Sequence, residues 1–133
     1  MTDRNIHGDW SITFKDRFML FVVKGATNDA AALAAFKEIK QLVLSSPQSD
    51  KTPWVFLNDG RQWEMDSANN EEIYADLLRW LEEHNCIYYA LVNSSKIQEF
   101  ALERQIPNLG ILEFSFDYDE AYATCLRKLE EGK

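Results

Sequence analysis

Apolar and polar residues along the chain form five short stretches with the patterns of β-strands. The first alternates from Trp10 to Phe14, which is the period of a strand that buries one face. The second, Phe18 to Val23, is apolar throughout, as in a central strand covered on both faces. The polar turn Lys15–Arg17 joins these two strands into a hairpin. The other three strands are expected at residues 54–57, 86–92 and 111–116.

Segments with the helical period of about 3.6 residues separate the later strands. The first runs from Ala30 to Leu44 and is rich in alanine, the strongest helix former. Its apolar face comprises Leu33, Phe36, Ile39 and Val43. A second helix is expected at about residues 70–84. Its inward side chains are Ile73, Leu77, Trp80 and Leu81.

Two capping boxes predict two further helices. Ser95 with Gln98 begins a short helix, which Ile106–Pro107 closes. Asp117 with Glu120 begins the last helix of the chain. The apolar stripe of that helix comprises Ala121, Tyr122, Cys125, Leu126 and Leu129.

The order of elements is therefore β-β-α-β-α-β-α-β-α, which indicates an α/β fold. Strands that alternate with helices form a mostly parallel sheet, and the opening hairpin adds one antiparallel pair. We expect a mixed five-stranded sheet with four helices. A chain of 133 residues without an internal repeat or linker predicts a single domain over residues 1–133, with its core at about 10–130.

The net charge and the two cysteines indicate which partners and which cellular compartment to expect. A formal net charge of −8 repels phosphate, so nucleic acid and anionic membranes are poor partners. The longest clean apolar run is too short to span a bilayer, and Met1–Asp9 does not resemble a signal peptide. Cys86 and Cys125 do not form a C-x-x-C pair, so we expect reduced packing thiols in a cytoplasmic protein.

A polar stretch, Asn58–Asn70, joins the third strand to the second helix. Strand-to-helix junctions are where α/β domains often place function. The candidates here for contact with a partner are Asp59, Arg61, Trp63, Asp66 and Asn69. Trp63 has no periodic partner, so two interpretations stay open. It either packs against the sheet, or it is an exposed anchor for a protein partner, a second copy in a homodimer or an apolar ligand.

The chain lacks the common catalytic and metal-binding motifs. G-x-S-x-G, the P-loop, G-x-G-x-x-G and H-E-x-x-H are all missing. Asp59, Glu64 and Asp66 lie close in sequence, but their spacing does not match a calcium loop. His7 and His84 have no partner at catalytic or metal spacing. We therefore expect no enzyme, metal or cofactor, and an enzyme that uses Asp59 and Asp66 is the least favoured alternative.

The element order and the junction resemble the STAS fold of bacterial anti-sigma-factor antagonists and SpoIIAA-like proteins. The resemblance covers residues 10–130 and centres on strand Val55–Leu57 and the pair Asp66–Ser67. The later segments that carry it are Ala90–Asn93, Ser95–Leu102, Ile106–Leu109, Phe114 and Glu120–Ala121. In the antagonists, this serine accepts a phosphoryl group from a partner kinase. The resemblance thus implies that Ser67 is a phosphorylation candidate, although Ala68-Asn69 replaces the family's small residue and glycine.

Two interpretations of Ser67 stay open. Ser67, or Asn69 with Glu72, can simply cap the second helix. Alternatively, phosphorylation of Ser67 adds charge near a helix start and works as a switch. The sequence thus predicts a non-enzymatic, cytoplasmic regulatory module that binds an anti-sigma or kinase-like protein. The alternative is a SpoIIAA-like binder of a small apolar or lipid-like ligand without a phosphoswitch.

Overall fold

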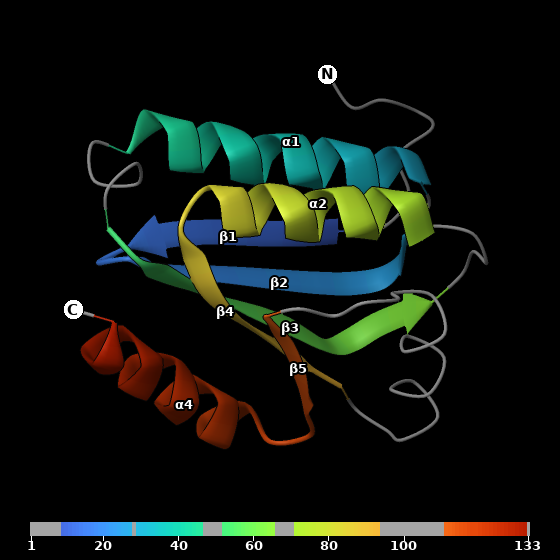
Figure 1. Ribbon diagram of the computed structural model, residues 1–133. Helices are drawn as coiled ribbons and strands as arrows, with labels where there is room; N and C mark the ends of the chain where they lie inside the picture. Colours follow the sequence, from blue (N-terminus) through green and yellow to red (C-terminus); the bar gives the residue numbers. More distant parts are fainter. Residues whose placement is uncertain (1–8, 28, 47–51, 66–70, 94–110, 133) are drawn as a thin grey trace.

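The computed structural model describes residues 9–27, 29–46, 52–65, 71–93 and 111–132, and it confirms the α/β class. Five strands and three helices lie within these residues (Figure 1). The elements are β1 (Asp9–Lys15), β2 (Phe18–Thr27), α1 (Asp29–Ser45), β3 (Trp54–Met65), α2 (Glu71–Glu83), β4 (Cys86–Val92), β5 (Leu112–Ser115) and α4 (Tyr118–Glu131). The helix expected from Ser95 to Ile106 falls on residues outside those described.

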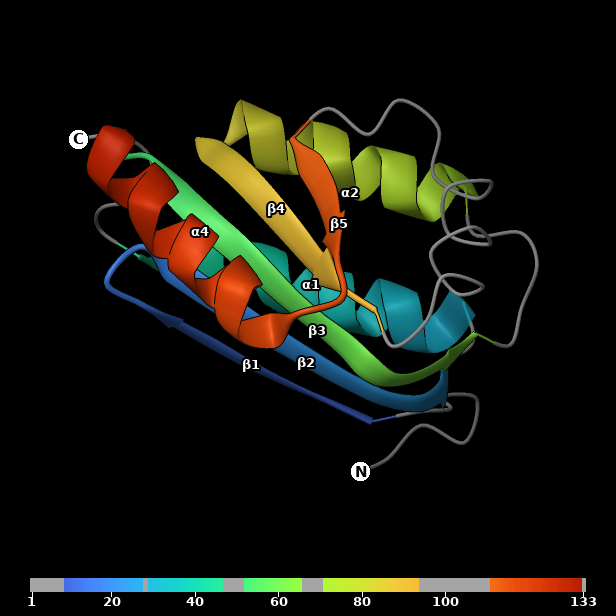
Figure 2. The same ribbon diagram turned by 90° about the horizontal axis from the view of Figure 1, so that it is seen from below.

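The strands form one mixed sheet in the order β1-β2-β3-β4-β5. β1 and β2 are antiparallel, and every other neighbouring pair is parallel, as the sequence predicts. Helices α1 and α2 cover one face of the sheet, and α4 covers the other (Figures 1 and 2). The central position of β2, predicted from its apolar sequence, is confirmed because β2 lies between β1 and β3.

The hairpin turn locks the first two strands onto the third. Asp16 and Arg17 have φ angles of 54° and 63°, the left-handed conformation that two-residue hairpin turns require. The carbonyl of Arg17 accepts a hydrogen bond from the Val55 N–H at 3.0 Å, and Arg17 Nη1 donates to the Pro53 carbonyl at 3.0 Å. The tight turn predicted at Lys15–Arg17 therefore also sets the start of the β2–β3 pairing.

Two strands extend well beyond the bounds that the sequence predicts. β2 continues from Val23 to Thr27, and β3 continues from Leu57 to Met65. The sequence predicts that the third strand ends at Leu57, before the polar stretch Asn58–Asn70, and this is wrong for residues 58–65, which belong to β3. The two extensions pair with each other, so the backbone polar groups along their shared border find partners within the sheet. That pairing outweighs the local turn preference of Asn-Asp-Gly.

The core on the α1 and α2 face is built around aromatic side chains. Phe56 and Tyr89 stack with ring centroids 4.4 Å apart, and Trp54 Nε1 donates to the His84 carbonyl at 2.7 Å. Helix α1 contributes the buried side chains of Ala32, Ala35, Phe36, Ile39 and Val43. Leu33 was expected on this face but is 57% exposed. The alanines take its place because they allow α1 to lie close to the sheet.

The core on the α4 face is smaller. Buried residues of α4 are Ala121, Cys125 and Leu129, and they pack on Val55, Leu57, Tyr88, Ala90 and Val92 of the sheet. Tyr122 and Leu126, expected in the buried stripe, are 40% and 46% exposed. Among the described residues, α4 is the one helix on this face and covers only part of it, so the flanks of α4 are exposed. Cys86 and Cys125 are free and buried, as packing thiols should be.

The N-cap of α4 gives a first test of the fold. Asp117 Oδ1 accepts a hydrogen bond from the Glu120 N–H at 3.1 Å, as the capping box predicts. Replacing Asp117 by alanine should lower the free energy of unfolding by about 1 kcal/mol, because that N–H loses its acceptor. Urea denaturation followed by circular dichroism measures the change. Asp117→Asn keeps an acceptor oxygen and is the control, and equal stability of the two variants would contradict the capping role.

Candidate functional site

Buried polar side chains gather where the pairing of β3 with β4 ends, in the middle of β3 and at the carboxyl end of β4. Among the described residues, the buried polar or charged positions are Asn58, Asp59 and Asn93. Asn58 pairs with Leu91 and Asp59 with Val92 across the two strands, and Asn93 directly follows β4. In open α/β sheets, binding sites lie at this edge. The sheet therefore brings together polar groups that are distant in sequence.

One extra residue in β3 changes the direction of its side chains at this edge. Val22 of β2 pairs with Asp59, whereas Lys24 pairs with Gln62, so two steps along β2 match three along β3. This β-bulge shifts the alternation of side chains between the two faces. The two parts of β3 on either side of the bulge therefore present their odd-numbered residues to opposite faces of the sheet.

Gly60 lies at the bulge and accounts for its position. A Cβ on Gly60 would lie 3.1 Å from the backbone oxygen of Val92, closer than an ordinary contact. Glycine therefore lets β3 approach β4 while it bends. Beyond the bulge, Trp63 packs with the core on the α1 and α2 face and is only 8% exposed. Of the two interpretations of Trp63, packing against the sheet is confirmed, and an exposed anchor is wrong.

Asp59 and Arg61 form an ion pair closed by two side-chain hydrogen bonds. Arg61 Nε donates to Asp59 Oδ1 and Nη2 donates to Oδ2, both at 2.8 Å. The Arg61 backbone N–H adds a third hydrogen bond to Oδ1 at 3.2 Å. The Asp59 side chain is 11% exposed and the Arg61 side chain 47% exposed. The carboxylate is therefore held inside while the guanidinium reaches the surface.

The Arg61 guanidinium also lies over an aromatic ring of α4. Its central carbon is 4.5 Å from the ring centroid of Tyr118, the first residue of that helix. A cation over an aromatic face is attracted by the negative charge density of the ring. Arg61 thus links β3 to α4, and together Asp59, Arg61 and Tyr118 form a cluster that we call the Arg61 cluster.

Electrostatics fix the charges of the Arg61 cluster. The side-chain hydrogen bond from Arg61 holds the pKa of Asp59 below its usual value, against the opposing effect of burial. The same bond raises the pKa of Arg61. Burial, followed by the nearby charge of Asp59, raises the pKa of Tyr118. The ion pair stays charged and the phenol neutral at pH 7, so the cluster suits recognition better than proton transfer.

A second polar group lies on the α1 and α2 face. Asn58 Nδ2 donates to Tyr89 Oη at 2.7 Å, within the buried core. Asn58 Oδ1 and both polar side-chain atoms of Asn93 have no hydrogen-bond partner within the part of the chain that the structure describes. Asn58 and Trp63 also line an apolar pocket between α1 and the sheet, with a volume of about 20 Å³. That pocket has room for roughly one water molecule and is far too small for a lipid-like ligand.

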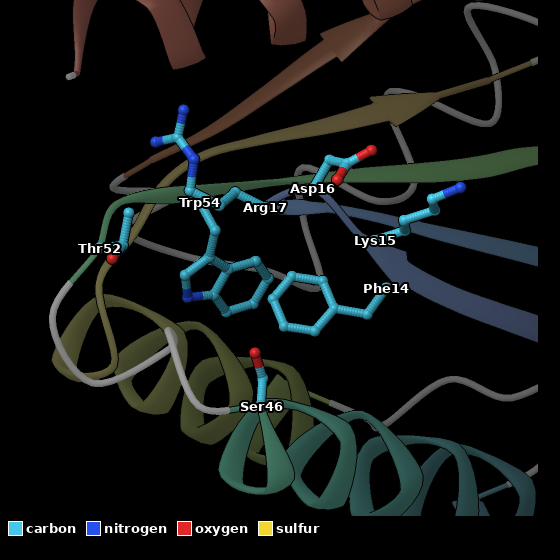
Figure 3. Close-up of a pocket in the computed structure, with 7 residues that line it drawn as sticks. All are labelled: Phe14, Lys15, Asp16, Arg17, Ser46, Thr52 and Trp54. Atoms are coloured by element: carbon cyan, nitrogen blue, oxygen red, sulfur yellow. The ribbon is translucent and has the colours of Figure 1, made fainter.

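Another pocket lies at the hairpin end of the sheet (Figure 3). Its volume is about 50 Å³, and its lining residues are Phe14, Lys15, Asp16, Arg17, Ser46, Thr52 and Trp54. Figure 3 shows the Ser46 hydroxyl directed toward the two aromatic rings, while Lys15 points away from them. The ring centroids of Phe14 and Trp54 are 5.1 Å apart, and Arg17 donates a hydrogen bond to the Pro53 carbonyl. These contacts tie the hairpin to the core, so we assign this pocket a structural role.

The structure brings together only part of the predicted site. Asp59 and Arg61 meet in the Arg61 cluster, but Trp63 lies on the opposite face of the sheet. Asp66, Ser67 and Asn69 lie outside the described residues. No group of three side chains that could hold a metal ion occurs among the residues that the structure describes. Likewise, no helix within those residues has both the length and the apolarity needed to cross a membrane.

Sequence reasoning missed three members of this edge. Asn58 and Asn93 end the apolar runs of two neighbouring strands, and that shared placement was a usable signal. Tyr118 left no such signal, because its contact with Arg61 joins residues far apart in the chain. Only the packing of α4 against β3 reveals it.

Comparisons with known proteins identify the fold. An anti-sigma factor antagonist from Mycobacterium paratuberculosis has 16% identity and a TM-score of 0.59 and aligns over 95% of this chain and 99% of its own. An uncharacterized protein with a SpoIIAA-like fold from Shewanella loihica has 19% identity and a TM-score of 0.55 over 94% and 98%. No protein-family model and no curated protein matches the sequence. The chain therefore has a STAS, or SpoIIAA-like, fold, as its resemblance implies.

The lowered pKa of Asp59 predicts how acid affects stability. Because the folded state favours the carboxylate, this contribution is complete above the unfolded-state pKa of about 3.9 and is lost as the pH falls through the lower folded-state value. Below about pH 4, the wild type should therefore lose more stability than Asp59→Asn does. Urea denaturation at a series of pH values measures this difference. Parallel pH profiles for the two proteins would show that the ion pair does not contribute.

Proposed function

We propose that the chain is a regulatory module that binds a protein partner around the stretch from Asn58 to Asn70, which includes the second half of β3. The main support is that a chain with a SpoIIAA-like fold over nearly its whole length has an exposed cation, Arg61, in the second half of β3. One of the similar structures is an anti-sigma factor antagonist, aligned over 95% of this chain. The proposed partner is a protein of the anti-sigma or kinase type.

The Arg61 cluster is the described part of the proposed surface. Arg61 is 47% exposed, yet it is held by Asp59 and by the ring of Tyr118. A cation fixed in this way loses little side-chain entropy when a partner's carboxylate or carbonyl binds it. Arginine and tyrosine are also enriched among residues that dominate interface energies. The cluster thus supports a protein contact.

The second part of the proposal is a phosphorylation switch at Ser67. In sequence, Ser67 lies between the last residue of β3, Met65, and the first residue of α2, Glu71. In the proposed step, the partner kinase transfers the γ-phosphoryl group of ATP to Ser67 Oγ. ADP leaves, and a base of the kinase takes the hydroxyl proton. The product carries about −1.5 to −2 added charges in a stretch that already holds Glu64 and Asp66.

The switch would act through local repulsion. A partner surface that accepts Arg61 is expected to be acidic, and a new phosphate close in sequence to Arg61 would oppose it. Binding of the unphosphorylated chain and release of the phosphorylated chain follow from this arrangement. The apolar pocket of about 20 Å³ between α1 and the sheet offers no comparable support for a lipid-like ligand.

Phosphorylation can be tested directly. The chain is incubated with a kinase-type anti-sigma factor, ATP and magnesium, and its intact mass is measured. We expect the mass to rise by one phosphoryl group in the wild type and in Ser11→Ala, a control that removes an exposed hydroxyl of β1. Ser67→Ala should show no increase. Phosphate on Ser67→Ala, or none on the wild type, would remove the switch from the proposal.

Binding is measured separately by calorimetry with the same partner. Ser67→Asp should weaken the affinity at least about tenfold if added charge drives release. Arg61→Gln should also weaken binding, whereas Lys128→Gln, a change of equal charge at the far end of α4, should not. Undiminished binding of both Ser67→Asp and Arg61→Gln would show that the stretch from Asn58 to Asn70 is not the contact surface.

A further inference from the structure

The two edges of the sheet differ greatly in length. β5 spans only four residues, whereas β1 spans seven and pairs with β2 without a break in register. Proteins protect an exposed edge by shortness, proline, a bulge or a charge within the strand. β5 is short, but β1 has none of these devices, since its charged residues are only its first and last. Figure 2 shows β1 as the outermost strand of the sheet, away from α4.

The hairpin geometry decides which backbone groups of β1 face outward. Lys15 and Phe18 pair next to the two-residue turn, and hydrogen bonding alternates along an antiparallel ladder. This alternation directs the N–H and C=O groups of Trp10, Ile12 and Phe14 away from β2. The side chains of these three residues are only partly buried against the core. Within the described part of the chain, β1 therefore offers outward-facing hydrogen-bonding groups and incompletely covered apolar surface.

The sequence of β1 is complementary to itself when read in the opposite direction. We propose that β1 pairs antiparallel with β1 of a second copy, across a two-fold axis at Ile12. Asp9 then lies opposite the partner's Lys15, and by symmetry Lys15 lies opposite the partner's Asp9. Trp10 faces the partner's Phe14, and Ser11 faces the partner's Thr13. Each pair joins side chains of the same kind or of opposite charge.

The pairing also agrees with the direction of the outward backbone groups. In this register the outward-facing Trp10, Ile12 and Phe14 meet one another, so each can exchange hydrogen bonds with the second copy. Sliding either copy by two residues shortens the ladder and separates Asp9 from the partner's Lys15. A slide by one residue places the outward-facing N–H and C=O groups of one copy opposite residues of the other copy whose N–H and C=O groups already bond to β2. The register centred on Ile12 is therefore the one that satisfies both charge and hydrogen bonding.

The exposed face of β1 leaves room for this contact. Asp9, Ser11, Thr13 and Lys15 are all exposed on the face that α4 covers elsewhere. Beside them, an open groove of about 270 Å³ separates β1 and β2 from α4, with Phe18, Leu20, Tyr122 and Leu126 among its lining residues. Among the described residues, nothing covers the α4 side of β1, so a second sheet can continue from it.

Charge reversal tests both the dimer and its register. Asp9→Lys places two lysines opposite each other at both ends of the ladder, so self-association should weaken about tenfold. Lys15→Asp should have the same effect through paired aspartates. The double variant Asp9→Lys with Lys15→Asp restores opposite charges and should recover the affinity. Glu131→Lys makes an equal change of charge at the end of α4 and should leave the affinity unchanged.

Mixing the two single variants, Asp9→Lys and Lys15→Asp, gives the sharpest result. The two lysines of one chain then face the two aspartates of the other, so the mixture should form heterodimers more readily than either variant dimerises alone. Sedimentation velocity of the full-length chains measures these affinities, and circular dichroism checks that each variant is folded. A wild type that stays monomeric at about 1 mM, or a mixture without preference for heterodimers, overturns the proposal.

A disulfide trap checks the register independently of charge. Ser11 and the partner's Thr13 form a pair of the closer, non-hydrogen-bonded type, whose Cα atoms lie about 4.5 Å apart, within the range of a disulfide. The double variant Ser11→Cys with Thr13→Cys should form covalent dimers under mild oxidation. Ser11→Cys alone is the control, since its cysteines do not face each other, and the native cysteines are buried. Equal cross-linking of the two variants, or none, overturns this register.

Discussion

The parallel pairing of β2 with β3 is the interaction on which the rest of the structure depends. It extends from Phe18 and Val55 to Thr27 and Met65, farther than any other pairing in the sheet. β3 is covered on both faces, and Trp54, Val55, Phe56 and Leu57 are fully buried. Once this ladder forms, the hairpin turn positions β1, and the bulge at Gly60 decides which side chains each face receives. The geometry of the candidate site thus depends on one strand pair.

Most of the fold could be predicted from the sequence because the strands and helices have recognisable local patterns of apolar and polar residues. Periodicity located all five strands, and the limits of β4 were predicted without error. The capping box of Asp117 marked the last helix correctly. The errors in strand length arose where tertiary pairing overrode local preference. Asn58–Gly60 has the composition of a turn, but Asn58 and Asp59 pair with both β2 and β4, and burial in the sheet decides the outcome.

The candidate site was predictable only in outline. The sequence indicated the polar stretch after Leu57, and Asp59 and Arg61 of that stretch do lie together, although within β3 rather than after it. The position of Trp63 could not be foreseen, because one extra residue in β3 decides which face of the sheet it occupies. The role of Tyr118 could not be foreseen either, since it depends on how α4 crosses β3. Spacing along a chain predicts neighbours within one element, but contacts between elements depend on packing.

The unequal edges of the sheet have a consequence for assembly. A strand of four residues at β5 presents too short a template for stable addition of another strand, while β1 presents a long one. A sheet that can grow at only one border cannot add copies indefinitely. Any symmetric pairing at that border uses it up in both molecules, so growth stops at a closed pair. A short last strand thereby favours closed pairs over open-ended fibres.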